Sequence, residues 1–164
     1  MGNEGAPELK KQLINFKLMK YLIFLASLTV LLLSCETEDP EFKTEFINPA
    51  SGYSQVVKVQ NEELITLYIS GQIGEGEDLD TQMRSALENL RQQLEAGGAG
   101  FKDIVKMNTY IVDYRPEDLD VFRGVRKEIM GDTDMPASTL VGVQALALPE
   151  WKIEIEAIAI YSTD

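Results

Sequence analysis

The chain of 164 residues is long enough for one ordinary domain and a targeting segment. Acidic residues number 27 against 15 basic ones, and so negative a surface repels nucleic-acid backbones, whose binding depends on Lys and Arg. The absence of His excludes Ser/His/Asp and Cys/His triads and most zinc or non-haem iron sites, so we expect no metal centre. Any chemistry must therefore come from carboxylates, hydroxyls, amides and cations.

Residues 1–34 predict an export signal. Residues 21–33 form an uncharged apolar run that is too short to span a bilayer but has the length of a signal h-region. The run leads into Leu32-Leu33-Ser34-Cys35, which resembles the lipobox of bacterial lipoproteins, where a peptidase cuts before a lipid-modified Cys. We expect Cys35 to carry the lipid; the alternative is a buried helix with an inert core Cys.

The stretch after Cys35 is acidic and shows no helical or strand periodicity, as expected for a tether. We place this tether at residues 35–46 and one domain at residues 47–164. The expected location is the bacterial cell envelope, at the outer membrane or facing the periplasm, with membrane contact through the lipid anchor only. Residues 1–18 are either an upstream extension or a misassigned start, because Met19 begins a more typical signal.

Three strands are predicted in the first part of the domain. Residues 54–59 and 65–70 are β-rich, and the turn-like residues 60–63 between them predict a hairpin. Residues 105–112 form the next strand. Alternation places four side chains of that strand on one face: Val105, Met107, Thr109 and Ile111.

Two amphipathic helices are predicted. The first has Asp78 or Asp80 as its N-cap, carries apolar side chains at intervals of three and four residues, and stops at residues 97–98, which are both Gly. The second starts near Pro116, a residue that is tolerated in a first turn, and carries an apolar stripe over residues 119–129. Both helices therefore have one face to bury.

Residues 139–148 and 152–161 complete the pattern as two further strands. The order is then ββαβαββ, which predicts an α+β domain with both helices packed on one face of a mixed sheet. Alternation in the last strand sends four side chains to the other face: Glu154, Glu156, Ile158 and Ile160. Because two of them are large and apolar, we predict that another subunit covers this face.

Several stretches of the domain form a recognisable set of motifs. They run in order over residues 47–161 and include Gly52-Tyr53-Ser54-Gln55, Ile69-Ser70-Gly71-Gln72, QMRSALENL at residues 82–90, Met135-Pro136-Ala137 and Ile153 to Ile160. Together they resemble the RidA family, also called YjgF, of reactive enamine/imine deaminases. The resemblance implies a chorismate-mutase-like fold, a homotrimer whose sheets form a central barrel, and small-molecule clefts between subunits. It also implies hydrolysis of an imine to a 2-keto acid and ammonia without a cofactor.

The resemblance implies roles for individual residues. Glu154 takes the position of the Glu that is thought to orient the attacking water. Tyr53 would line the cleft, and Ser70 with Gly71 would contribute the binding loop. From the residues alone, a solvated strand face for Glu154 and ordinary strand-end packing for Tyr53 and Ser70 stay open.

One position departs from the family pattern. Active members carry an Arg after Pro-Ala that clamps the substrate carboxylate, whereas this chain has Ser138, followed by Thr139. A bidentate Arg–carboxylate pair supplies two charge-assisted hydrogen bonds of about 1.5–3 kcal/mol each, which Ser cannot replace. Ser138 and Thr139 are either substrate-binding residues or simple structural replacements. Arg123 replaces a residue, often Asn, that helps line the pocket, so either Arg123 enters the pocket or the ligand is not an imino acid.

Two functions follow from these observations. The first is a cofactor-independent hydrolase of enamine or imine compounds, based on Glu154 and the intact loops. The second is a non-catalytic trimer that binds small molecules at the cell envelope, based on Ser138 and the expected lipid anchor. A ribonuclease conflicts with the negative charge and the missing His.

Overall fold

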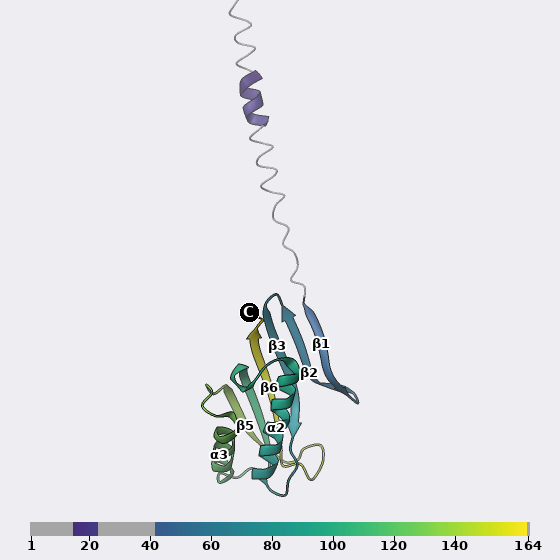
Figure 1. Cartoon of the computed structure of the whole chain (residues 1–164), viewed down its shortest axis with the longest axis vertical. Coiled ribbons are helices and arrows are strands. Elements are labelled where there is room, and N and C mark those ends of the chain that lie inside the picture. The colour runs from purple at the N-terminus through teal and green to yellow at the C-terminus, as the bar shows by residue number, and fades with distance from the viewer. Residues whose placement is uncertain (1–14, 23–41, 164) are drawn as a thin grey trace, which may run out of the picture. The chain divides into compact units, whose positions relative to one another are not determined.

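The computed structural model describes residues 15–22 and 42–163. The chain divides into two units, Met1–Asp39 and Pro40–Asp164. In the first unit, residues 15–22 form a helix (Figure 1). None of the described helices is long and apolar enough to cross a membrane. Most of the predicted signal run, Cys35 and the tether as far as residue 41 lie outside the described residues, so the lipoprotein signal stays a prediction.

The second unit is an α+β domain, as the sequence predicted (Figure 1). Its elements in chain order are β1 (Lys43–Ala50), β2 (Tyr53–Asn61), β3 (Leu64–Ile73), α2 (Leu79–Gly97), the 3₁₀ turn η1 (Phe101–Asp103), β4 (Ile104–Val112), α3 (Asp118–Met130), β5 (Ala137–Val143) and β6 (Ile153–Ser162). The strands form one mixed sheet in the order β1-β2-β3-β6-β4-β5. Neighbouring strands are antiparallel except for β4 and β5, which are parallel.

Helix α2 begins and ends at residues that suit a helix terminus. Asp78 is the N-cap, and its side chain accepts a hydrogen bond from the Thr81 backbone N–H at 2.9 Å. Gly98 ends the helix with a φ of 90°, a left-handed conformation that favours glycine. The predicted cap and stop are therefore confirmed, with Asp78 rather than Asp80 as the cap.

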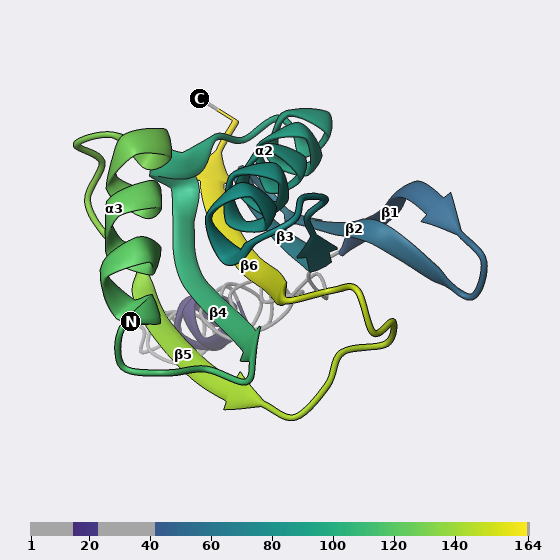
Figure 2. The same ribbon diagram turned by 90° about the horizontal axis from the view of Figure 1, so that it is seen from below.

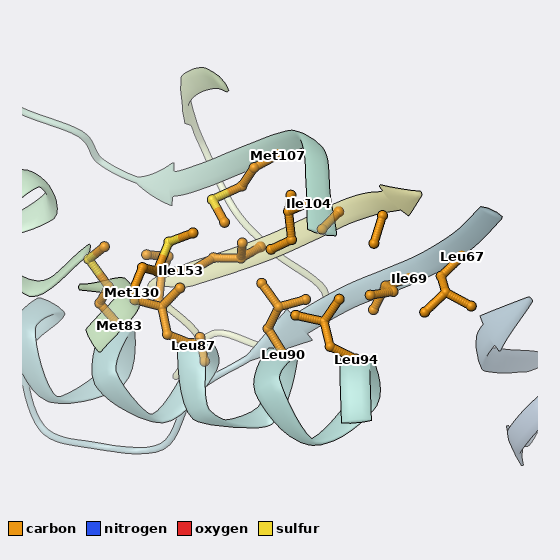
Figure 3. Packing of buried hydrophobic residues seen from close by; sticks show 14 of the residues in the cluster. Leu67, Ile69, Met83, Leu87, Leu90, Leu94, Ile104, Met107, Met130 and Ile153 are labelled. Carbon is orange, nitrogen blue, oxygen red and sulfur yellow. The ribbon is translucent and has the colours of Figure 1, made fainter. Parts of the chain in front are cut away.

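Both helices bury their apolar sides in one core. Leu87, Leu90 and Leu94 of α2 are fully buried against the side chains of β3 and β6 (Figure 3). Phe122 and Val125 of α3 join the same cluster, and Figure 2 shows α3 beside β4 and β5. The opposite face of the sheet, which we call the open face, is covered by neither α2 nor α3. In β6 the alternation is as predicted, because every second residue from Ile153 to Ala159 is buried.

The structure adds an edge strand that the sequence analysis missed. The first four residues of β1, Lys43–Phe46, lie in the segment that was assigned to the tether, and β1 pairs along its length with β2. Its side chains are almost all exposed, and it contains Pro49 near its end. An exposed strand held by backbone pairing has little hydrophobic pattern, and Pro is tolerated on edge strands. The β1–β2 hairpin extends beyond α2 (Figure 2).

Two further details differ from the prediction. Strand β5 spans Ala137–Val143 instead of residues 139–148, because its last partner on β4 is Val112, the end of that strand. In β4 the register shifts after Ile104, so Ile104 is buried and Val105 is 44% exposed. A bulge of this kind reverses the facing of one residue, which simple alternation cannot anticipate.

Candidate active site

A pocket opens where β2, β3 and β6 meet α2 and the loop before β6. Its volume of about 740 Å³ suits a small metabolite. The residues that line it are Tyr53, Gln55, Ser70, Gly71, Gln72, Ile73, Asn89, Gln93, Ala147, Trp151 and Glu154. The structure thus brings together four residues that were singled out from the sequence: Tyr53, Ser70, Gly71 and Glu154. We call this cavity the Glu154 pocket.

A β-bulge in β3 lies beside Glu154. The register with β6 shifts between Ile69 and Gln72, so Ser70 and Gly71 are outside the regular pairing. Bulges re-aim side chains and are common next to active sites. A Cβ atom on Gly71 would overlap the Glu154 carboxylate, so the missing side chain lets this carboxylate lie over the bulge.

Amide hydrogen bonds orient the tyrosine of the pocket. The side-chain nitrogen of Gln72, a residue only 5% exposed, donates to Gln55 Oε1 at 2.8 Å and to the Ser70 carbonyl at 2.9 Å. Gln55 donates in turn to the Tyr53 hydroxyl at 3.3 Å. The Ser70 hydroxyl donates to the Ser54 carbonyl at 2.7 Å, which leaves lone pairs on Ser70 Oγ for a ligand donor.

Helix α2 and the loop before β6 supply another wall. The Asn89 side chain donates to a β3 carbonyl at 2.9 Å, which fixes its amide beside the pocket. The buried side chain of Gln82 anchors the loop, because it donates to the Glu150 carbonyl at 2.9 Å and accepts from the Lys152 N–H at 2.8 Å. Trp151 lies between these two tied residues, so α2 sets its position.

Glu154 alone is charged among the described residues that line the pocket. Burial raises the pKa of its carboxyl, and the neighbouring Glu156 carboxylate raises this pKa further. Glu156 accepts hydrogen bonds from Asn108 at 2.7 Å and from the Tyr110 hydroxyl at 3.1 Å. No described side chain donates to Glu154, so its oxygens are available to a water molecule or a ligand. A carboxylate with a raised pKa is suited to take a proton from water.

Ser138 does not lie in the Glu154 pocket of its own chain. It pairs with Met107 on β4, whereas Glu154 pairs with Tyr110, three residues further along β4 and on its other side. With a strand spacing of about 4.8 Å and a rise of about 3.3 Å per residue, the two Cα atoms are about 14 Å apart. Met107 is buried beneath the helices, so Ser138 faces the helix side and Glu154 the open side.

Thr139 and Arg123 also lie away from the pocket. The Thr139 hydroxyl accepts a hydrogen bond from the Lys106 ammonium at 2.7 Å. Arg123 is exposed on α3 and does not line the Glu154 pocket of its own chain. The arginine that contacts Ser138 is Arg126, one helical turn later, whose Nη1 lies 3.4 Å from Ser138 Oγ.

Seven lining residues were not picked out from the sequence: Gln55, Gln72, Ile73, Asn89, Gln93, Ala147 and Trp151. Two signals were present. Asn89 and Gln93 are four residues apart, which places two amides on one side of a helix. Gln72 is a polar side chain next to an apolar strand, where it must find hydrogen-bond partners if it is buried. Trp151 carries no such signal, because its position depends on the path of a loop.

The sheet order and the two crossover helices define an α+β domain of the chorismate-mutase-like class. The family model described as Endoribonuclease L-PSP matches residues 43–161. The chain therefore belongs to this family, which is the RidA family that the sequence motifs resembled. This family and fold agree with the predictions from the sequence.

Individual relatives agree with this assignment. A 2-iminobutanoate/2-iminopropanoate deaminase of Dermatophagoides farinae is 32% identical over 120 residues, which cover 68% of this chain and 88% of the relative. The crystal structure of RidA from an Antarctic Psychrobacter is 34% identical, with a TM-score of 0.59 over 68% of this chain and 90% of that one. A YjgF-family structure from Mycobacterium tuberculosis has 28% identity and a TM-score of 0.59, covering 73% and 98% of the two chains.

Proposed function

We propose that the domain hydrolyses small reactive imines or enamines, with Glu154 directing the attacking water. The observation that carries this proposal is the Glu154 carboxylate, which lies over the Gly71 bulge with a raised pKa and without a described hydrogen-bond donor. The name of the Dermatophagoides relative, an iminobutanoate and iminopropanoate deaminase, supports the same reaction class. The surrounding hydroxyls and amides provide groups that can position a small polar substrate.

The reaction needs only water and proton transfers. The Glu154 carboxylate takes a proton from water while the water oxygen bonds to the imine carbon and the C=N π electrons move to nitrogen. Glu154 then gives this proton to the nitrogen of the tetrahedral intermediate. The hydroxyl group then gives its proton, through Glu154, to the same nitrogen, the carbonyl forms as the C–N bond breaks, and ammonia leaves. Imine and water thus become carbonyl compound and ammonia, with no oxidant, reductant or cofactor consumed.

We further propose that a second copy of the chain completes the site, in a homotrimer. Large apolar side chains on the open face support an oligomer, since Tyr68 is 51%, Val141 41% and Ile160 37% exposed in the single chain. The distance between Ser138 and Glu154 within one chain has the same implication, because one small ligand cannot reach both. Light scattering after size exclusion should give three times the chain mass; a monomer at micromolar concentration would refute the assembly.

The test of the proposed function is ammonia release from freshly generated imines. The 2-imino acid 2-iminobutanoate and the carboxylate-free imine of 2-butanone would be compared. Glu154→Gln should lower kcat by about 100-fold or more, because a general base contributes roughly 10²–10⁴-fold. Glu150→Gln is the matched control, since it removes an exposed carboxylate from the nearby loop. Equal rates for Glu154→Gln and the wild type would refute the role of Glu154.

A second candidate function is binding without catalysis. It is favoured by the lack of a cation among the described lining residues and by Ser138 at the clamp position. A non-catalytic protein would release no ammonia from either imine above the Glu154→Gln background. It would still bind small polar molecules in the Glu154 pocket, which Trp151 fluorescence can report, because Trp151 is the one tryptophan of the chain.

We also propose that Cys35 anchors the protein to the bacterial envelope through lipid. The support is the apolar run that ends in Leu-Leu-Ser-Cys and the acidic stretch that follows. The full chain, expressed in a bacterium that processes lipoproteins, should partition into detergent and have a mature N-terminus at Cys35. Cys35→Ser should remain in the aqueous phase. An unprocessed wild-type chain would refute the anchor.

A further inference from the structure

Two arginines on α3 have no ion-pair partner in the described structure. The ion pairs among the described residues all belong to Arg84 and Arg91 of α2, although acidic residues are abundant. Arg123 and Arg126 are three residues apart, so they lie on one side of α3. In so acidic a chain, two neighbouring arginines without carboxylate partners form a local site for an anion.

Contacts hold the guanidinium of Arg126 in place. It stacks over the Phe122 ring, 4.8 Å from its centroid, and its Nη1 lies 3.4 Å from Ser138 Oγ on β5. These two contacts occupy one face of the fork and one nitrogen, so other N–H donors remain free. A fork fixed by stacking loses less freedom when it binds a planar carboxylate, and the Ser138 hydroxyl adds a donor beside it.

The electrostatics of the two arginines also favour an anion. Burial lowers the pKa of Arg126, and the positive charge of Arg123 lowers this pKa further. Both effects mean that the charged guanidinium is held in an unfavourable environment without a counter-ion. An anion that bonded to Arg126 would relieve both the desolvation and the repulsion from Arg123.

We propose that Arg126, oriented by Ser138 and Phe122 and assisted by Arg123, binds the carboxylate of the substrate. This inference rests on the proposed function and deepens it, because it makes 2-imino acids the substrate class. The cation that is absent from position 138 is then supplied by Arg126 of helix α3, which contacts Ser138. Arg126 is the specificity-determining residue, and Ser138 is a positioning residue.

Binding of the product, 2-oxobutanoate, tests the site without turnover. Isothermal titration with 2-oxobutanoate and with the carboxylate-free ketone 2-butanone would compare the wild type, Arg126→Gln and Arg115→Gln. Arg126→Gln should weaken 2-oxobutanoate binding at least about tenfold, because charge-assisted hydrogen bonds are lost. Arg115→Gln removes the same charge from an exposed loop residue and should change affinity less than about twofold. Equal affinities for Arg126→Gln and the wild type would overturn the proposal.

Three further arms sharpen the assignment. Arg126→Lys should recover only part of the affinity, since an ammonium keeps the charge but cannot form a fork. Inorganic phosphate should compete weakly with 2-oxobutanoate; if phosphate bound more tightly than the keto acid, the site would be a phosphate site and the proposal would fail. Ser138→Ala should weaken binding less than Arg126→Gln does, and the reverse order would overturn the roles given to the two residues.

Turnover separates this inference from the proposed function. Arg126→Gln should raise KM for 2-iminobutanoate about tenfold or more and leave the 2-butanone imine unaffected. Glu154→Gln should slow both substrates. If Glu154→Gln slows neither, the proposed function fails, and the titrations still decide whether Arg126 binds carboxylates. Suppose instead that Glu154→Gln slows both substrates and that Arg126→Gln also slows both equally. The proposed hydrolysis is then supported, and the carboxylate site at Arg126 is refuted.

Discussion

The Glu154 pocket and the arginine site on α3 are opposite in character. The pocket is enclosed by amides, hydroxyls and one carboxylate, and its shape depends on a strand bulge and an anchored loop. The arginine site, formed by Arg123, Arg126 and Ser138, is positive and lies between helix α3 and the edge strand β5. Among the described residues, the pocket has a carboxylate that can activate water but no cation, and the arginine site has cations that can bind a carboxylate but no general base.

The separation of the two sites has a chemical consequence. If Arg126 lay beside Glu154 in one chain, an ion pair would lower the pKa of Glu154 and occupy the guanidinium that should bind substrate. Because they are apart, burial and Glu156 can keep that pKa raised, and Arg126 keeps free donors. A cleft between two copies would bring them together only across a bound ligand.

The largest expected effect concerns the loop of the Glu154 pocket. Gln82→Leu removes the hydrogen bonds of the buried Gln82 amide to the backbone of Gly76, Glu150 and Lys152. We expect a loss of about 3 kcal/mol in the free energy of unfolding, since each lost hydrogen bond contributes about 0.5–1.5 kcal/mol. Urea denaturation measures it. Gln92→Leu, at an exposed position of the same helix, should change stability by less than about 0.5 kcal/mol.

The same variant distinguishes the two sites. At temperatures where Gln82→Leu stays folded, quenching of Trp151 by pocket ligands should weaken, because the loop that carries Trp151 has lost its anchor. The carboxylate contact with Arg126 should persist, because α3 and β5 do not depend on Gln82, so the variant should still bind 2-oxobutanoate more tightly than 2-butanone. Loss of this preference for the carboxylate would mean that the two sites are not structurally independent.

The next effect separates activity from stability. Gly71→Ala places a Cβ where the Glu154 carboxylate lies, and this flexible side chain can swing away with little cost in stability. Turnover should fall about 100-fold, because a misplacement of about 1 Å can cost that much. The matched control is Gly124→Ala, whose Cβ would meet no atom within 4 Å. This control should keep full activity; unchanged turnover in Gly71→Ala would show that Glu154 is not positioned by the bulge.

Much of the fold could be predicted because its signals are local. The caps of α2, the helix stripes and the alternation of β6 each depend on neighbours in sequence. Strand β1 was missed because its side chains stay exposed and its pairing is a backbone property. The bulges in β3 and β4 were missed because they depend on which strand lies alongside, which a single segment does not encode.

The candidate site was only partly predictable for a similar reason. Glu154, Ser70, Gly71 and Tyr53 lie in segments that matched a family pattern, and the fold gathers them. Arg126 gave no such signal, because its importance depends on a contact between α3 and β5 that sequence spacing does not specify. The sequence shows that position 138 carries Ser instead of a cation. Only the structure shows that the guanidinium of Arg126 lies beside this residue.

A smaller effect on KM is expected when an arginine is placed on strand β5 at position 138. In an Arg126→Gln background, Ser138→Arg should lower KM for 2-iminobutanoate by up to about tenfold, since one bidentate pair is restored on another backbone position. In the wild-type background it should gain less, because two guanidiniums would then repel each other. Steady-state kinetics with the carboxylate-free imine as control measures both. Equal gains in the two backgrounds would show that Arg126 and position 138 do not share a ligand.

The smallest effect is a shift in the pH profile. Activity requires the ionised Glu154, so kcat/KM should fall as pH drops through the raised pKa of this carboxyl. Glu156→Gln removes the second cause of that raised pKa and leaves burial, the first, so the acidic limb should move to lower pH but stay above that of an ordinary Glu.

Salt separates the two causes of this shift. High salt screens the charge of Glu156 but does not change burial. Added KCl should therefore move the acidic limb of the wild-type kcat/KM profile toward the pH of the Glu156→Gln limb and leave the limb of this variant unchanged. Glu150→Gln should show the wild-type profile at every salt concentration, because its side chain is exposed in the loop. If neither Glu156→Gln nor added salt moved the acidic limb of the kcat/KM profile, another group would titrate in the reaction and Glu154 would not be the base.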